Sequence, residues 1–221
     1  MNVFSNIKDQ IVDMLNPSNV VSLKTYINRN TNKKNPILNT SLKAAMDLEL
    51  SKAFNKAGSN KLSVKCYEVS GYYFIVCKVP SLTKDGIYYD EVFRVTSDKK
   101  EKISDREIKI FSNDPSFIYR YAYVFNQLDL LIPEYKKLLP PECLNTPPTK
   151  TNPLESPTAH KYSMLAGIYL LDKISIDKIK LEDFVIKTTL QNLFSMTQSF
   201  NSVMNKYQNT KTSKPFKLKN L

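Results

Sequence analysis

Apolar and polar residues alternate with a period of two along residues 62–69 and 72–79, which is the pattern of paired β-strands. The dipeptide Ser70-Gly71 separates the two runs and is typical of a two-residue hairpin turn. If Val69 pairs with Tyr72, one face of the hairpin collects apolar side chains and becomes its core side. That face carries Leu62, Val64, Cys66, Tyr73, Ile75, Cys77 and Val79.

Further strands and several helices follow from the same kind of pattern. An Asp85-Gly86 turn leads into a β-rich run at 87–96, and residues 108–112 supply a fourth short run. Helical periodicity marks residues 3–15 and about 41–57 before the strands, and about 159–174 and 180–207 after them. We therefore predict an α+β fold, a small antiparallel meander with N-terminal helices and a C-terminal helical part.

Seven of the twelve prolines fall within residues 133–157, which divides the chain. We predict an α+β core domain at 1–132 and a Pro-rich, largely extended connector at 133–157. Residues 158–208 are predicted to form helices that pack on the core, and 209–221 a basic, flexible tail.

Five aromatic residues occupy every second position from Phe117 to Phe125. Alternation argues for a strand. Asp114 followed by Pro115, however, is a good start for a helix, and the run also has a helical apolar stripe. We favour a helix that ends before Pro133.

The aromatic run has three interpretations. Core packing is favoured because aromatic side chains bury large areas. A protein–protein interface is the second, since tyrosine and arginine are enriched there. The third is a stacking platform for single-stranded nucleic acid. The candidate interface residues of this run are Phe117, Tyr119, Arg120, Tyr121, Tyr123 and Phe125.

A second candidate interface lies in the predicted helix at 180–207. Its apolar positions repeat at heptad spacing with one polar break at Thr197. The flanking positions lack the charged pairs of an independent coiled coil, so packing within the chain is favoured over an oligomer or partner seam. The seam comprises Ile186, Leu190, Leu193, Phe200, Met204 and Tyr207.

The formal net charge of +11 is concentrated at the two ends of the sequence. Residues 1–60 hold 8 basic and 4 acidic groups and the last thirteen residues hold 4 lysines and no acid, whereas residues 61–132 hold 11 and 10. Cationic ends of this kind can meet phosphate groups or acidic protein surfaces. The candidate contacts are Lys33, Lys34, Lys211, Lys214, Lys217 and Lys219.

Residues suited to catalysis are scarce. His160 is the only histidine and is expected at the surface near a helix start. The four glycines are not clustered, which excludes phosphate-cradling loops. The adjacent acids Asp90-Glu91 should point apart, and the three cysteines have no metal or redox spacing and are interpreted as core residues. We expect no enzyme, no metal and no cofactor.

The N-terminal residues lack a signal-peptide pattern, and no run approaches the length of a membrane span. We therefore expect a protein that is neither secreted nor transmembrane.

Three segments carry a resemblance. FSNDPSF at 111–117, YAYVFN at 121–126 and KYSMLAGIYLL at 161–171, with the proline-rich stretch between them, resemble uncharacterised proteins of tailed phages from low-GC hosts. The resemblance covers residues 108–172 and contains no catalytic motif. It implies a virion or assembly component, located in the virion or host cytoplasm.

The expected function is therefore a non-enzymatic structural or assembly protein of a larger complex. The most specific form is a tailed-phage virion component at the capsid or head–tail region, acting through contacts with other proteins of the same assembly as a homo- or hetero-oligomer. The alternative is a nucleic-acid-binding accessory protein that uses the basic N-terminal loop and C-terminal tail.

Overall fold

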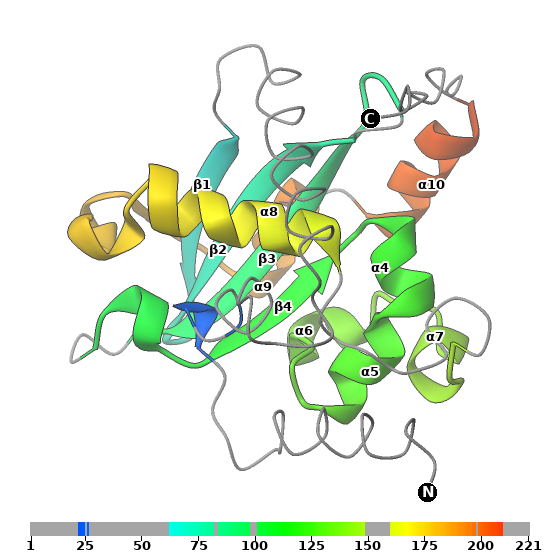
Figure 1. The fold of residues 1–221 in the computed structure, drawn as a ribbon, viewed down its shortest axis with the longest axis horizontal. Coiled ribbons are helices and arrows are strands. Elements are labelled where there is room, and N and C mark those ends of the chain that lie inside the picture. The colour runs from blue at the N-terminus through cyan, green and yellow to red at the C-terminus, as the bar shows by residue number, and fades with distance from the viewer. Residues whose placement is uncertain are drawn as a thin grey trace, which may run out of the picture.

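The computed structural model describes residues 22–24, 26, 62–81, 84–97, 101–148, 160–197 and 199–209. Its centre is a five-stranded mixed sheet of order β4-β3-β2-β1-β5, flanked by helices (Figure 1). The strands are β1 (Ser63–Val69), β2 (Tyr72–Pro80), β3 (Tyr88–Thr96), β4 (Ile108–Ser112) and β5 (Val185–Lys187). The predicted α+β class and the four-stranded antiparallel meander are confirmed.

The first hairpin has the predicted register. Val69 pairs with Tyr72 and Cys66 with Ile75. The turn residues Ser70 and Gly71 both have positive φ, at 50° and 80°, as a type I′ turn requires. Local turn chemistry therefore sets this part of the sheet.

The sheet is buried on both faces. Ile75 and Cys77 lie on the predicted core side, but Phe74 and Val76, which point to the opposite face, are buried as well. Two layers of helix therefore cover the sheet, although alternation alone had indicated only one core side.

Helix α8 (Lys161–Ile168) lies across one face, in front of the sheet in Figure 1, and continues into a π-helical turn at Tyr169–Lys173. The opposite face is covered by α6 (Pro133–Lys136) and α9 (Leu190–Met196). There the ring of Tyr135 stacks on Phe111 of β4 at 4.3 Å and meets Phe194 of α9 edge-on at 5.0 Å.

The β4 edge of the sheet is covered. Helices α4 (Pro115–Arg120) and α5 (Ala122–Gln127) follow β4 directly, which confirms the helical interpretation of the aromatic run. The chain then returns alongside β4. The backbone N–H of Ile110 donates to the Leu130 carbonyl at 2.7 Å, and the Ile132 N–H donates to the Ile110 carbonyl at 3.2 Å.

Two predictions about the C-terminal half are wrong. The connector is not largely extended where it is described, because α6 and α7 (Glu142–Asn145) lie within it. The single helix predicted at 180–207 is divided into a 3₁₀ turn at Leu181–Asp183, strand β5, helix α9 and helix α10 (Phe200–Asn209). Further 3₁₀ turns occur at Ile103–Asp105 and Ile176–Lys178.

The division has local causes. Val185, Ile186, Thr188 and Thr189 are β-branched and disfavour helix. The Thr189 side chain accepts the Asn192 N–H at 3.2 Å and begins α9 as its N-cap.

The helices predicted at 3–15 and 41–57, the lysines Lys33 and Lys34, and the tail beyond Asn209 lie outside the described residues.

Candidate functional site

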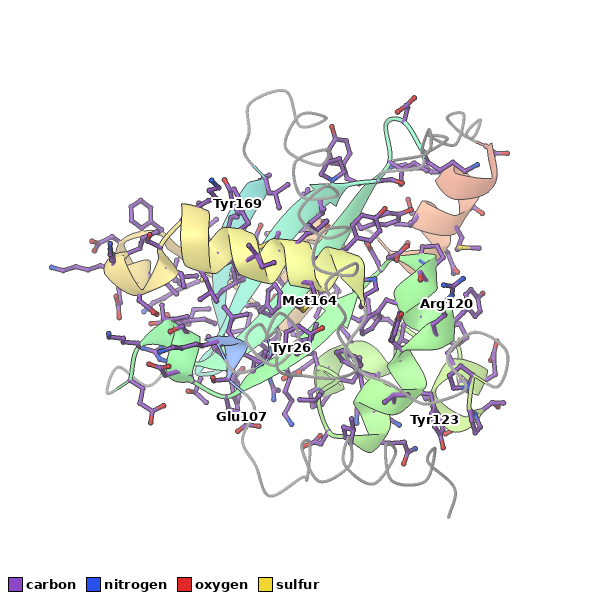
Figure 2. The ribbon with its side chains drawn as sticks, viewed as in Figure 1. Tyr26, Glu107, Arg120, Tyr123, Met164 and Tyr169 are labelled. Atoms are coloured by element: carbon purple, nitrogen blue, oxygen red, sulfur yellow. The ribbon has the colours of Figure 1, made fainter. Side chains whose placement is uncertain are left out.

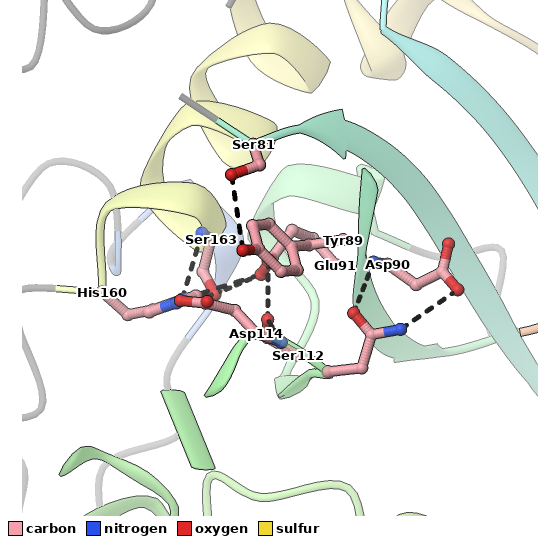
Figure 3. A network of polar contacts seen from close by, with 9 residues as sticks. Ser81, Tyr89, Asp90, Glu91, Ser112, Asp114, His160 and Ser163 are labelled. Atoms are coloured by element: carbon pink, nitrogen blue, oxygen red, sulfur yellow. Dashed lines mark hydrogen bonds and ion pairs between the residues drawn. The ribbon is translucent and has the colours of Figure 1, made fainter. Parts of the chain in front are cut away.

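The main cluster of polar side chains in the described core lies where β3, β4 and α8 meet (Figure 3). Glu91 projects from β3 and Ser112 from the end of β4. Asp114 directly precedes α4, His160 directly precedes α8, and Ser163 lies in the first turn of α8. We call these five residues the polar ring.

The ring is closed by hydrogen bonds. The Ser112 hydroxyl donates to Glu91 Oε1 at 2.6 Å, and the Ser163 hydroxyl lies 2.7 Å from Glu91 Oε2. Ser163 Oγ is also 2.7 Å from His160 Nδ1, and His160 Nε2 is 3.0 Å from Asp114 Oδ2. The Asp114 backbone N–H returns to Ser112 Oγ at 3.0 Å and completes the circuit.

The ring is sealed from solvent. Glu91 and Ser163 have no exposed surface, His160 retains 1% and Asp114 4%. The rings of Phe117, Tyr121 and Tyr162 lie 5.1, 5.7 and 6.0 Å from the imidazole of His160. The expectation that His160 lies at the surface is therefore wrong.

Burial changes the acidity of Glu91. Loss of water raises the pKa of its carboxyl to about 7, although the nearby His160 and the two serine hydroxyls favour the ionised form. Desolvation favours the protonated form of a buried carboxyl unless neighbouring groups donate hydrogen bonds to the carboxylate.

The hydrogen bonds indicate where the protons lie. The Ser163 N–H donates to His160 Nδ1 at 3.3 Å, so Nδ1 is an acceptor and Nε2–H donates to Asp114. With Glu91 protonated, its hydroxyl donates to Ser163 Oγ, and the Ser163 hydroxyl donates to Nδ1. With Glu91 ionised, the Ser163 hydroxyl donates to Glu91 Oε2 and leaves no proton for the 2.7 Å contact between Ser163 Oγ and an unprotonated Nδ1. The protonated form of Glu91 therefore satisfies the ring more completely.

Asp114, His160 and Ser163 are the residue types of a hydrolytic triad, but their geometry differs. Nδ1 faces the serine and Nε2 faces the aspartate, whereas in hydrolytic triads Nε2 takes the serine proton. Ser163 is fully buried inside α8 and cannot reach a substrate carbonyl. The arrangement is suited to fastening α8 to the sheet.

A second polar group lies beside the ring on the opposite face of the sheet. The Asp90 N–H donates to Asn113 Oδ1 at 2.8 Å, and the Asn113 N–H donates to the Asp90 carbonyl at 3.4 Å. Lys78 Nζ lies 4.0 Å from Asp90 Oδ1. Asp90 and Glu91 therefore point to opposite faces, as predicted for adjacent strand residues, and both are buried.

The predicted aromatic interface divides between core and surface. Phe117 and Phe125 are fully buried, and their rings meet edge-on at 5.1 Å, so the core interpretation is confirmed for them. Tyr119 is 51% exposed and Arg120 is exposed, while Tyr121 and Tyr123 are half-buried. Figure 2 shows Arg120 and Tyr123 at the periphery of α4 and α5, away from Met164, which lies over the sheet.

The predicted heptad seam does not form, because its residues belong to separate elements. Ile186 lies on β5 and is 49% exposed, whereas Leu193 on α9 is fully buried. Leu190 and Met204 are half-buried. Phe200 and Tyr207 belong to α10, but their side chains are not among those described. Lys211, Lys214, Lys217 and Lys219 lie outside the described residues, as do Lys33 and Lys34.

The polar ring itself was not predicted. In the structure the His160 side chain caps α8 by accepting the Ser163 N–H, but histidine is not among the residue types that favour this position, so the sequence held no clear signal for it. Nothing local linked that pair to Glu91, which lies 72 positions from Ser163.

The cysteines agree with their predicted role in the core. Cys66, Cys77 and Cys143 are all free and buried. Burial raises the pKa of the Cys66 thiol to about 12, so it stays protonated and unreactive near neutral pH. Within the described ranges, no three His, Cys, Asp or Glu side chains are arranged to hold a metal ion. None of the helices in that part of the chain is long and apolar enough to cross a membrane.

Comparisons of the chain with family models, with curated proteins and with solved structures found no match.

Proposed function

We propose that this chain is a non-enzymatic structural or assembly protein that acts through protein–protein contacts. The observation that carries the proposal is the β5 edge of the sheet. Strand β5 ends the sheet order. Phe184, which directly precedes it, is 66% exposed, and Ile186 on the strand is 49% exposed. Large apolar side chains at an open strand edge favour association with another chain.

The contrast between the two sheet edges strengthens the argument. The backbone of residues 130–132 pairs with Ile110 at the β4 edge, so that edge is closed. Among the described residues, β5 pairs only with β1 in the sheet order. We define the β5 edge surface as Phe184, Val185, Ile186 and Lys187.

Two further observations support a role in assembly. In the part of the chain that the structure describes, the cluster with catalytic residue types is sealed in the core, and both imidazole nitrogens of His160 lie within hydrogen-bond distance of a partner. The resemblance of residues 108–172 to tailed-phage proteins suggests the setting. We propose a virion component at the capsid or head–tail region, whose partners are other proteins of the same assembly.

The proposal is tested by the solution mass of the full chain, measured by light scattering. We expect a defined oligomer that dissociates when Phe184→Asp and Ile186→Asp are combined, because two charges would be buried at the contact. Tyr88→Asp is the matched control. Tyr88 is 42% exposed but lies on β3, three strands from β5, so the mass should not change.

The same measurement with a short DNA duplex distinguishes the nucleic-acid alternative. An oligomer that is indifferent to DNA supports the proposal. A monomer that gains mass only with DNA and at low salt would overturn it and assign the function to the basic ends, because counterion release makes phosphate binding strongly salt-dependent.

A further inference from the structure

The polar ring needs one hydrogen more than its side chains hold when Glu91 is ionised and His160 is neutral. Ser163 Oγ lies 2.7 Å from both Glu91 Oε2 and His160 Nδ1, and each of these short contacts requires a hydrogen. The serine hydroxyl supplies one, so the second must come from the carboxyl or from the imidazole. Closure of the ring is therefore linked to the binding of a proton.

The second hydrogen belongs to Glu91. His160 Nδ1 accepts the Ser163 backbone N–H at 3.3 Å, so this nitrogen carries no hydrogen of its own. Two other contacts of the ring are the same in both states of Glu91. The Ser112 hydroxyl donates to Oε1, and His160 Nε2–H donates to Asp114. Loss of the proton therefore acts at one place, the contact between Ser163 Oγ and His160 Nδ1.

That contact holds the first turn of α8. The same nitrogen of His160 caps the helix, and the Met164 N–H donates to the His160 carbonyl at 3.1 Å. When Glu91 is ionised, the Ser163 hydroxyl donates to it, and lone pairs of Oγ and Nδ1 face each other across 2.7 Å. The repulsion is relieved when His160 and Ser163 move apart, which weakens the cap.

The remainder of α8 is held by other contacts. The side chains of Leu165 and Ala166 have no exposed surface. Beyond the far end of the helix, the N–H and the hydroxyl of Ser104 donate to the two carboxylate oxygens of Asp177 at 2.9 and 2.6 Å. Neither contact involves Glu91, so we expect the movement to be confined to the first turn.

The neighbouring titratable groups do not take the place of Glu91. In the described part of the chain, those that face Glu91 or His160 are Cys77 on β2, Asp114 before α4, Tyr121 at the end of α4, Tyr162 on α8, and Tyr26. Burial raises the pKa of the Cys77 thiol and of the Tyr26 and Tyr121 phenols, so these three stay neutral near pH 7. Asp114 accepts Nε2–H in both states of the ring.

We propose that the polar ring is a pH-sensitive latch, which is closed while it holds its proton and releases the first turn of α8 when that proton passes to solvent water. The closed form is favoured at acidic pH and the released form at alkaline pH. This inference goes beyond the proposed function and does not depend on it.

Amide hydrogen exchange in the full chain tests the latch. The reporter is the Met164 N–H, whose exchange rate is divided by the intrinsic rate at each pH to give an opening constant. The open turn binds the proton less tightly, so this constant should rise by up to about tenfold per pH unit from pH 5 and level off above pH 7. Opening of one turn exposes little surface, so urea well below the unfolding transition should not change it.

Controls separate this local opening from global unfolding. Amides of the central strand β2, which is paired on both sides, should have smaller opening constants that rise with urea. Glu91→Gln supplies the second hydrogen from its amide at every pH, so the Met164 constant should lose its pH dependence. Asp90→Asn removes the adjacent buried carboxyl, which points to the opposite face, and should keep the pH dependence.

The outcomes decide the proposal. A rise at Met164 that is insensitive to urea, abolished by Glu91→Gln and kept in Asp90→Asn supports the latch. A constant value across this pH range, a rise that only follows β2 with the same urea dependence, or equal behaviour of the two variants would overturn it. The oligomeric state measured by light scattering is a separate readout, so either result leaves the test of the proposed function intact.

Discussion

At the scale of single residues, Glu91 is a buried carboxyl whose lost hydration must be replaced by hydrogen bonds within the protein. Its carboxyl has no exposed surface, and two serine hydroxyls and the edge of an imidazole replace the lost water. Ser163 links two partners because its oxygen lies 2.7 Å from both Glu91 Oε2 and His160 Nδ1. Removing any one member would leave a buried polar atom unsatisfied, which costs more than the hydrogen bond itself contributes.

The raised pKa of Glu91 predicts how stability depends on pH. The carboxyl titrates near its usual 4.5 when unfolded and at about 7 when folded, so the folded state binds its proton more tightly. Its stabilisation is complete below pH 4.5 and is lost as pH rises through 7, by up to about 3 kcal/mol. The free energy of unfolding in urea, measured from pH 5 to pH 8, should decline for this reason.

Glu91→Gln isolates this effect from the other groups of the ring. Glutamine keeps the shape and carries no titrating proton, while His160 and Asp114 remain in place. The difference in unfolding free energy between the two proteins should change across pH 5 to 8 in favour of the variant at high pH. Parallel curves would show that Glu91 does not titrate in this range.

Ser163→Ala tests the link between α8 and the sheet. Glu91 and His160 would both lose the hydroxyl that joins them, so we expect a loss of about 1–3 kcal/mol in the unfolding free energy. Ser195→Ala is a matched control on α9, because Ser195 is exposed and donates only to the Asn192 carbonyl. The control should cost less than about 0.5 kcal/mol. Equal losses of unfolding free energy in the two variants would show that the Ser163 hydroxyl does not stabilise the protein through the polar ring.

At the scale of elements, the helix pair α4–α5 divides the aromatic run between the core and the surface. Helical periodicity turns Phe117 and Phe125 inward, where they pack on each other and on Phe111 and His160. The same periodicity leaves Tyr119 outside. The helix pair therefore contributes Phe117 and Phe125 to the core and leaves Tyr119 on an amphipathic outer surface.

Phe125→Ala should be strongly destabilising. It would open a cavity beside Phe117 and Tyr26, whose rings lie 5.1 and 6.4 Å from that of Phe125, and cost about 3–5 kcal/mol. Tyr123→Ala, two positions away and half-buried, should cost roughly 1 kcal/mol. Thermal and urea unfolding of both variants measure this difference. Similar costs at the two positions would show that the run does not divide into core and surface.

At the scale of the whole molecule, one edge of the sheet is closed, and the other, at β5, has no further strand partner among the described residues. Helices cover both of its faces, and the chain after α5 closes the β4 side. The β5 side keeps outward backbone groups and exposed apolar side chains. We therefore expect the protein to associate through the β5 edge surface, and the solution mass of the variant that combines Phe184→Asp with Ile186→Asp tests this.

Local sequence determined the elements that short-range chemistry can specify. Ser70-Gly71 and the alternation around it set the hairpin and its register, since the turn geometry and the two-residue period leave little freedom. Asp114-Pro115 marked the start of α4, although the Asp114 side chain bonds to His160 instead of capping the helix. The α+β class followed from the same patterns.

Only the tertiary structure decided the long-range pairings. β5 is a strand because β1 offers it a partner, with Cys66 opposite Val185 far along the chain. Without that partner, the apolar spacing of residues 180–207 resembles a helix. The polar ring likewise draws its members from β3, β4, the start of α4 and the start of α8. Sequence spacing carries the local preferences of the backbone, whereas burial and hydrogen-bond partners depend on which distant segments meet.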